Sequence, residues 1–279
     1  MLNLVCLMLI VCPGVDFHET TTSKYYVQIV QEGVLLVKTP KTSLQKPSQI
    51  ISKVISPALR LWLRSQVEEV ATLQLSIVGC DRQILTGYIP QVSLAAKQAV
   101  YQGLHLSQIQ LEGSNIRLNL GQIIKGKPLR LLEPVPVVGQ LLLLEPDLQS
   151  SLEAPLLSNA LTELLYTFLK SDDIIQPDKD PKTPQIRWQK ININIGQLTL
   201  RGISTNSDVG AKLIVIRAGI QLATPQQLEL NPLQVQIDPD APPISLDGFL
   251  INLGPEVELQ ELTLTTGQLI CRGGLKVMP

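Results

Sequence analysis

The chain repeats one spacing of aliphatic residues: two at alternate positions, two residues skipped, then two more at alternate positions. Alternation is typical of a strand with one apolar face, because successive side chains of a strand point to opposite sides. The skipped pair shifts the alternation by one position, which fits either a β-bulge within one strand or a tight turn between two strands. The five copies are Leu104, Leu106, Ile109 and Leu111; Ile193, Ile195, Leu198 and Leu200; Leu228, Leu230, Leu233 and Val235; Ile244, Leu246, Phe249 and Ile251; and Val257, Leu259, Leu262 and Leu264. The pattern predicts a mostly antiparallel sheet with one strongly aliphatic face.

Composition narrows what this aliphatic face can serve. Hydrophobic residues make up 44% of the 279 residues, aromatic residues only 4% and charged residues 17%, against about 25% charged residues in an ordinary soluble domain. This balance suits either an ordinary wide aliphatic core or an interior that holds an aliphatic ligand. A net charge of −1 gives no overall field that would attract nucleic acid, so we expect no nucleic-acid partner.

Periodicity divides the chain into a leader and one domain. Residues 1–47 show little pattern, and within them Leu2–Cys12 has the length of a signal-peptide apolar core, although no Lys or Arg precedes it. A weak signal peptide and a mis-set start codon both stay open. We predict a single domain over residues 48–279, with an exposed linker at 172–184, where three prolines and alternating charges separate two halves.

Two segments have the 3.6-residue period of an amphipathic helix. The first runs from Ser48 to about Val70, and the second begins at Ser150, which fits a capping box with Glu153, and ends near Lys170. The predicted strands are Thr72–Gly79, Gln83–Ile89, Val92–Tyr101, Leu104–Glu112 and Ile116–Leu120, followed by short edge segments within residues 122–138 and, beyond the linker, only strands from Gln185 to Lys276. The predicted order is therefore helix, sheet, helix, linker, sheet.

No set of residues in the sequence fits a catalytic or metal-binding pattern. The histidines His18 and His105 have no Cys or carboxylate at ligand spacing, and the cysteines have no metal-binding spacing. A nucleophile elbow, a glycine-rich phosphate loop and a dinucleotide fingerprint are all missing from the sequence. We therefore predict a protein without catalytic residues, metal or cofactor. Cys80 and Cys271 are expected to be lone buried thiols, or a disulfide if the protein is exported.

The densest basic group lies between two predicted strands. Lys125, Lys127 and Arg130 are flanked by the aliphatic residues Ile123 and Ile124. Cations mixed with exposed aliphatic side chains are what a peripheral membrane protein places among lipid headgroups, so these three cations are candidate headgroup or membrane contacts. An ordinary polar turn is the alternative.

Six short segments carry a resemblance to a known family. They are Ile51–Leu59, Gly87–Pro90, Val100–Ile109, Asn115–Arg117, Lys125–Leu132 and Pro155–Leu161. They resemble the LmeA-like phospholipid-binding family, known mainly from cyanobacteria and actinobacteria, and the chain looks like a cyanobacterial-type member. The resemblance is strong over less than half of the chain, looser over the C-terminal strands, and does not include residues 1–47.

The resemblance implies lipid binding in an α+β fold. Long amphipathic helices would pack on a strongly curved, mostly antiparallel β-sheet, similar to tubular lipid-binding proteins. The family motifs are structural and carry no ligand contacts over, so we predict the site from the apolar faces of the helices. The candidate lipid-binding residues are Ile51, Val54, Ile55, Leu59 and Trp62 on the first helix and Leu157, Leu161 and Leu164 on the second.

We therefore expect a non-catalytic protein that binds phospholipid or another acyl lipid at a membrane surface. The acyl chains would lie between the helices and the sheet, and the role would be lipid handling or envelope maintenance. Two alternatives stay open: a structural or protein-interaction module with a dry core, and an accessory factor for an envelope glycosyltransferase. The compartment is open as well, between the periplasm or cell envelope and the cytoplasmic face of the membrane.

Overall fold

The computed structural model describes residues 64, 67–119, 130–171, 186–204, 212–237 and 242–279, which form a mostly β protein. The strands are β1 (Glu69–Val78), β2 (Tyr88–Tyr101), β3 (Leu104–Arg117), β4 (Val135–Leu144), β5 (Ile186–Asn194), β6 (Gln197–Ser204), β7 (Lys212–Thr224), β8 (Gln227–Gln236), β9 (Ile244–Leu246), β10 (Phe249–Asn252), β11 (Val257–Thr265) and β12 (Gln268–Val277). The helices of this part of the chain are α3 (Asp81–Leu85), α5 (Glu145–Ser151) and α6 (Pro155–Ser171).

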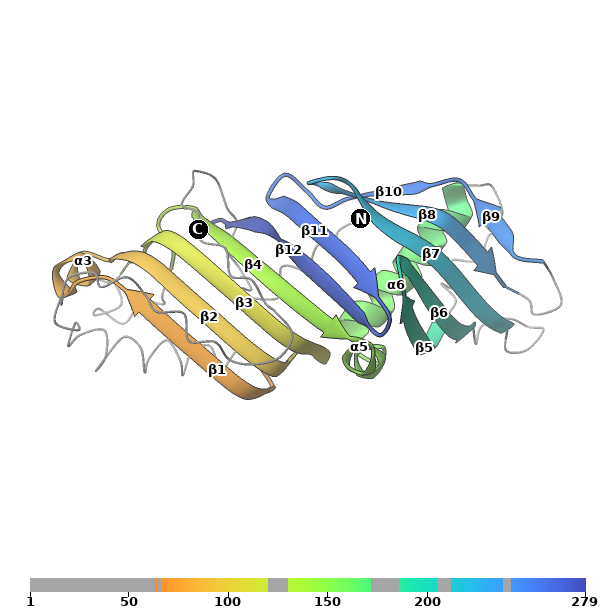
Figure 1. Ribbon diagram of the computed structural model, residues 1–279, viewed down its shortest axis with the longest axis horizontal. Coiled ribbons are helices and arrows are strands. Elements are labelled where there is room, and N and C mark those ends of the chain that lie inside the picture. Colours follow the sequence, from red (N-terminus) through yellow and green to blue (C-terminus); the bar gives the residue numbers. More distant parts are fainter. Residues whose placement is uncertain (1–63, 65–66, 120–129, 172–185, 205–211, 238–241) are drawn as a thin grey trace, which may run out of the picture.

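The strands form two antiparallel six-stranded sheets that lie side by side along the long axis of the molecule (Figure 1). The first sheet has the order β1-β2-β3-β4-β12-β11, so the last hairpin of the chain returns to pair with β4. The second sheet has the order β10-β8-β7-β6-β5, with β9 also paired to β8. Helix α6 crosses behind the second sheet in Figure 1.

This architecture corrects two parts of the predicted fold. The antiparallel pairing is confirmed, but the strongly curved sheet is instead two open sheets. The predicted long helices are helices of 5, 7 and 17 residues in the part of the chain that the structure describes. Six strands are within the ordinary size of an open twisted sheet, so neither sheet needs strong curvature.

The repeated aliphatic spacing is a β-bulge in two of its five copies. In β11 the register against β12 shifts just after Leu259, which leaves Gln260 as the extra residue. In β8 the extra residue falls at Asn231-Pro232, opposite Gly219 of β7. A Cβ atom on Gly219 would lie 2.2 Å from the Asn231 carbonyl oxygen, so only glycine fits opposite this bulge. Each bulge returns the second half of the spacing to the face of the first half.

The other three copies take different forms. Ile195, which is 81% exposed, lies in the tight turn between β5 and β6. Asp247-Gly248 separate β9 from β10, and these two short strands pair with β8 on either side of its bulge. Strand β3 runs without interruption through its copy, and Gln98 of the neighbouring β2 adopts the left-handed region with φ of 48°. The partner strand therefore decides which form the same spacing takes.

The segment predicted as a strand at Gln83–Ile89 begins instead as helix α3. The side-chain oxygen of Gln83 accepts the backbone N–H of Cys80 (3.1 Å), which caps the helix. Ile84 is fully buried, and Gly87 ends the turn with φ of 84°, a conformation that favours glycine. A local cap and a turn glycine thus outweigh the strand propensity of the aliphatic residues.

Three predicted boundaries also differ. Val70, predicted as the end of the first helix, lies in β1, whereas the region predicted as short edge segments, residues 122–138, overlaps the start of β4, an interior strand between β3 and β12. Pro136 is tolerated there because it lies beyond the last β3–β4 pair, so only one neighbouring strand needs its backbone. The helix predicted from Ser150 is two helices, since the Ser150 hydroxyl donates to the Pro146 carbonyl within α5 (3.1 Å) and α6 begins at Pro155.

Helix α5 joins the two sheets by covering the free edge of β5. The Glu145 carboxylate accepts the backbone N–H of Ile193 (2.7 Å), and one turn later the Gln149 side chain accepts the N–H of Ile191 (3.0 Å). On the other side of α5, the Ser151 hydroxyl accepts a backbone N–H of β3 (2.8 Å). These bonds satisfy strand-edge groups that would otherwise be open to another chain, and they fix the sheets to each other.

Candidate lipid-binding face

One face of the first sheet is apolar across all six strands. Directly paired residues of neighbouring strands project to the same face, so the register defines three complete rows. In the order of the strands, the rows are Leu73, Ala96, Ile109, Leu141, Cys271 and Leu262; Leu75, Leu94, Leu111, Gly139, Gly273 and Leu259; and Ile77, Val92, Gly113, Val137, Leu275 and Val257. These three rows, the apolar face, contain no charged or hydrogen-bonding amide or hydroxyl side chain.

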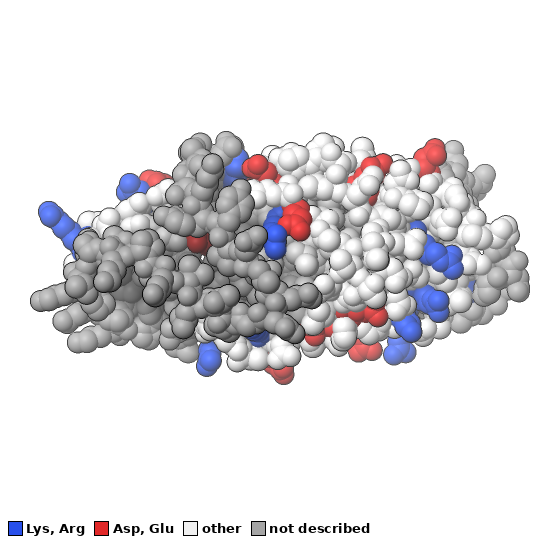
Figure 2. Space-filling view, in the orientation of Figure 1, with Lys and Arg blue, Asp and Glu red and all other residues white. Residues whose placement is uncertain are grey.

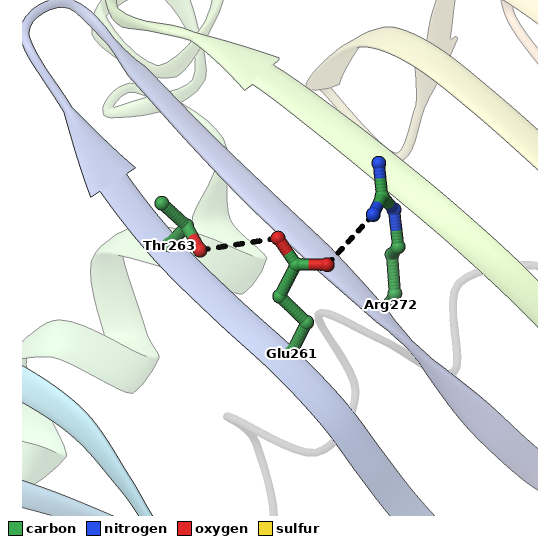
Figure 3. A network of polar contacts seen from close by, with 3 residues as sticks. All are labelled: Glu261, Thr263 and Arg272. Carbon is green, nitrogen blue, oxygen red and sulfur yellow. Dashed lines mark hydrogen bonds and ion pairs between the residues drawn. The ribbon is translucent and has the colours of Figure 1, made fainter. Parts of the chain in front are cut away.

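The opposite face of the same sheet is polar. One row of it consists of Gln74, Ala95, Gln110, Gln140, Arg272 and Glu261. Arg272 Nη1 lies 2.7 Å from Glu261 Oε2, and the Thr263 hydroxyl donates to the other carboxylate oxygen at 3.3 Å (Figure 3). Because both charged side chains of this pair are about 40% exposed (42% and 40%), this side of the sheet faces solvent.

The interior strands of the first sheet leave the apolar face half-buried. Strands β2, β3, β4 and β12 have a neighbour on each side. Seven aliphatic residues of the face on these strands are nevertheless partly exposed: Val92, Leu94, Ile109, Leu111, Val137, Leu141 and Leu275. In a close-packed core, aliphatic side chains at such positions are fully buried. A continuous set of half-buried aliphatic side chains is therefore the feature of this molecule best suited to contact acyl chains.

The corresponding face of the second sheet is closed, because α6 packs on it. Five residues of this core are at most 5% exposed: Ile193, Leu200, Ile216, Leu233 and Val235. Two contacts fix the helix there: Trp188 Nε1 donates to the Thr162 hydroxyl (3.1 Å), and the rings of Phe168 and Phe249 meet edge to face with centroids 4.8 Å apart. This part of the molecule is an ordinary packed core.

Three of the predicted lipid-binding residues lie on α6 and face this core. Leu157 and Leu161 are buried, and Leu164 is partly buried against the same hydrophobic cluster. The structure thus brings these three residues together in one hydrophobic cluster, which contains residues of both sheets. The residues predicted on the first helix lie outside the described residues: Ile51, Val54, Ile55, Leu59 and Trp62.

The half-buried strand residues were missed by reasoning from the helices. Leu111 belongs to the repeated spacing, and Val92 and Leu94 alternate within one predicted strand. Alternation marks a strand face but does not tell which face a helix covers, since burial depends on residues distant in sequence. The sequence therefore contains the strand pattern of these residues, but it does not show that their side chains are partly exposed.

The predicted headgroup contacts are described only at Arg130, because Lys125 and Lys127 lie outside the described residues. Arg130 is exposed at the α3 end of the first sheet. Leu85 and Leu132, which are 68% and 56% exposed, lie at the same end, since Leu85 is the last residue of α3 and the N–H of Leu132 donates to the carbonyl of Arg117 at the end of β3. A cation and exposed aliphatic side chains thus do occur together there.

The described residues hold no group of His, Cys, Asp or Glu that could bind a metal ion. Within the same residues, no helix is long and apolar enough to cross a membrane. Cys80 and Cys271 are free thiols, and Cys80 is exposed rather than buried as predicted. Burial and, to a smaller extent, the charge of Glu261 raise the pKa of the Cys271 thiol to about 12, so this residue of the apolar face is neutral at physiological pH.

The fold and the site define a β-rich protein in which one apolar sheet face is closed and the other is half-open. The chain belongs to the LmeA-like phospholipid-binding family, which it matches over residues 47–274. The family name implies phospholipid binding, and the match indicates no catalytic family. A comparison with curated proteins and a comparison with solved structures each found no match.

Proposed function

We propose that the protein binds phospholipid without catalysis, with the acyl chains lying against the apolar face of the first sheet. The observation that carries this proposal is the set of seven half-buried aliphatic side chains on interior strands of that face. Burial of an acyl chain there is favourable by about 0.8 kcal/mol for each CH₂ group, so a single chain supplies a large driving force. The family match supports phospholipid as the lipid class.

The helices complete the site in this proposal. In this proposal Leu157, Leu161 and Leu164 of α6 would bound the acyl-chain site, since they belong to the same hydrophobic cluster as Ile109 and Leu141 of the apolar face. The residues predicted on the first helix would cover the face from its other end: Ile51, Val54, Ile55, Leu59 and Trp62. Arg130, with Lys125 and Lys127, would contact the phosphate of the headgroup or the membrane surface.

The biological role that fits this site is lipid handling or envelope maintenance. A protein that holds acyl chains against a sheet face can carry a lipid or sense it, and neither role needs a catalytic residue. We also propose that the chain is a cyanobacterial-type member of its family.

The direct test is native mass spectrometry of the full chain, with organic extraction of any lipid that co-purifies. We expect one phospholipid for each protein molecule. In the double variant Leu94→Trp/Leu111→Trp the indole rings occupy the volume of the acyl chains, so the lipid should be lost while the fold is kept. Leu142→Trp is the matched control, because Leu142 is also half-buried in β4 but points to the opposite side of the sheet from its neighbour Leu141. A lipid-free mass for the purified protein that persists after incubation with phospholipid vesicles would contradict the proposal.

A further inference from the structure

The outer face of the second sheet, turned away from α6, carries a group of cations. In the described residues, strands β5, β6 and β7 contain five Lys or Arg and no Asp or Glu. Four of the five project to the outer face: Arg187, Lys190, Arg201 and Arg217. Figure 2 shows Lys and Arg side chains grouped over these strands. These four residues are called the basic face below.

The register brings the cations of the basic face close together. Lys190 is directly opposite Arg201, and Arg217 lies on the next strand, diagonal to Arg201. Like charges directly opposite each other on a sheet are destabilising, because their separation is small. Among the described residues, the one ion pair of the group is Arg187–Glu153, at 4.0 Å between side chains that are 76% and 84% exposed. Such an exposed pair contributes little.

The other residues of the basic face favour a lipid surface as its partner. Arg187 shares its row with Ile203 and with Leu213, which is 36% exposed, so aliphatic side chains stand beside the cations. A single-stranded nucleic acid would need aromatic platforms for its bases, and the nearest aromatic residue in these strands, Trp188, is buried in the core on the other side. Cations with aliphatic neighbours instead complement a bilayer of anionic headgroups.

We propose that the basic face docks the protein on an anionic phospholipid bilayer, which supplies the lipid for the apolar face. This inference adds a membrane-contact site to the proposed function, on a different sheet from the acyl-chain site. The four cations act together by charge complementarity, and docking weakens as salt screens it.

The test is co-sedimentation of the full chain with vesicles of phosphatidylglycerol and, in parallel, of phosphatidylcholine. We expect binding to phosphatidylglycerol that falls with rising ionic strength. The double variant Lys190→Gln/Arg201→Gln should bind about 30-fold more weakly, on the basis of about fivefold for each cation near the surface. The matched comparison uses single variants: Arg201→Gln should bind about fivefold more weakly, and the control Lys97→Gln removes one exposed cation from the polar face of the first sheet. This control should keep wild-type affinity.

Three results would overturn the inference: equal weakening by Arg201→Gln and Lys97→Gln, no weakening by either, or tighter binding of the wild type to oligonucleotides than to phosphatidylglycerol vesicles. The lipid content of each variant, measured by native mass spectrometry, separates this inference from the proposed function. If Lys190→Gln/Arg201→Gln loses vesicle docking but retains one bound lipid, the result supports both proposals. Normal docking by a protein that never holds lipid would refute the proposed function and leave the docking site standing.

Discussion

The two sheets of this protein have similar apolar faces, but these faces are buried to different extents. On the second sheet, α6 closes the face, and residues such as Leu200, Leu233 and Val235 are at most 4% exposed. On the first sheet, residues at equivalent interior positions, such as Leu94 and Leu111, are half-buried. The composition of the two faces is alike, so the difference lies in how they are packed.

This difference separates a structural role from a binding role. A closed apolar face contributes to stability, because its side chains exchange water for protein neighbours. A half-open face leaves part of that transfer free energy to be gained from a ligand. We therefore assign stability mainly to the second sheet and acyl-chain binding to the first.

The largest expected effect compares equivalent leucines on the two sheets. Leu233→Ala on the closed face should lower the free energy of unfolding by about 2–5 kcal/mol, because a cavity is left in a packed core. Leu94→Ala on the half-open face should lower it by about 1 kcal/mol in lipid-free protein, since less contact is lost. Urea denaturation of delipidated protein measures both values. Equal losses would mean that the two faces are equally closed.

The next effect concerns the joint between the sheets. Glu145→Ala removes the acceptor of the Ile193 N–H (2.7 Å) and of the Asn192 side chain (3.2 Å). Leaving these donors without a partner should cost about 1–3 kcal/mol. Hydrogen exchange should accelerate at β5, whereas exchange in β2 and β3 should not change. Glu145→Gln, which keeps one side-chain oxygen, is the control and should show a smaller effect. Unchanged exchange at β5 would show that α5 does not protect this edge.

A smaller effect, opposite in sign, is expected on the outer side of the second sheet. Arg201→Gln should raise the free energy of unfolding by about 0.2–1 kcal/mol, because it removes the cation directly opposite Lys190. Arg217→Gln is the control, since Arg217 is opposite Thr199 on one side and Gln234 on the other. The difference between these variants should shrink in high salt. A destabilising effect of Arg201→Gln at low salt would rule out like-charge repulsion at this pair.

The smallest effect is one of reactivity, with stability hardly changed. A thiol introduced by Leu111→Cys should be alkylated in lipid-free protein and protected when phospholipid is bound. Cys271, on the same face, should stay unmodified in both states at pH 7–9, because it is buried and its pKa is raised to about 12, far above the pH at which a thiolate would form. Peptide mapping by mass spectrometry distinguishes the two sites. Equal labelling of the introduced thiol with and without lipid would place the acyl chains elsewhere.

The raised pKa of Cys271 also predicts the direction of a pH effect. The reference pKa of 9.0 applies to the unfolded chain, and the folded value is about 12. Between these values the unfolded state has already lost the proton that the folded state keeps. Stability should therefore be unaffected below pH 9 and should fall as the pH rises above it. A Cys271→Ala variant, measured over the same pH range, should lack this component of the decrease.

Alternation in the sequence was sufficient to predict the apolar faces. It places Leu259 and Leu262 on one face on the assumption of a bulge, and β11 contains that bulge. It could not distinguish this bulge from the turn at Ile195, because the choice depends on the register of a partner strand. The same dependence on distant residues explains why the start of β4 was predicted as a short edge segment although β4 pairs with β12, which is more than a hundred residues away in sequence.

The candidate site was less predictable than the fold. The helix period correctly places Leu157 and Leu161 on the inward side of α6. It does not reveal that this side meets a closed core, because burial is set by residues of the second sheet such as Trp188 and Phe249. The basic face could not be predicted from the sequence either, because its cations are spread over three strands and the net charge of −1 gives no sign of them.

The position of the acyl chains can be mapped by photo-crosslinking with a phospholipid that carries a diazirine in its acyl chain, followed by peptide mapping. We predict crosslinks on β2, β3 and β4, at or beside Leu94, Leu111 and Val137, and none on the closed face at Leu233 or Val235. Crosslinks concentrated on β7 and β8, or a complete lack of crosslinks with lipid present, would contradict this prediction.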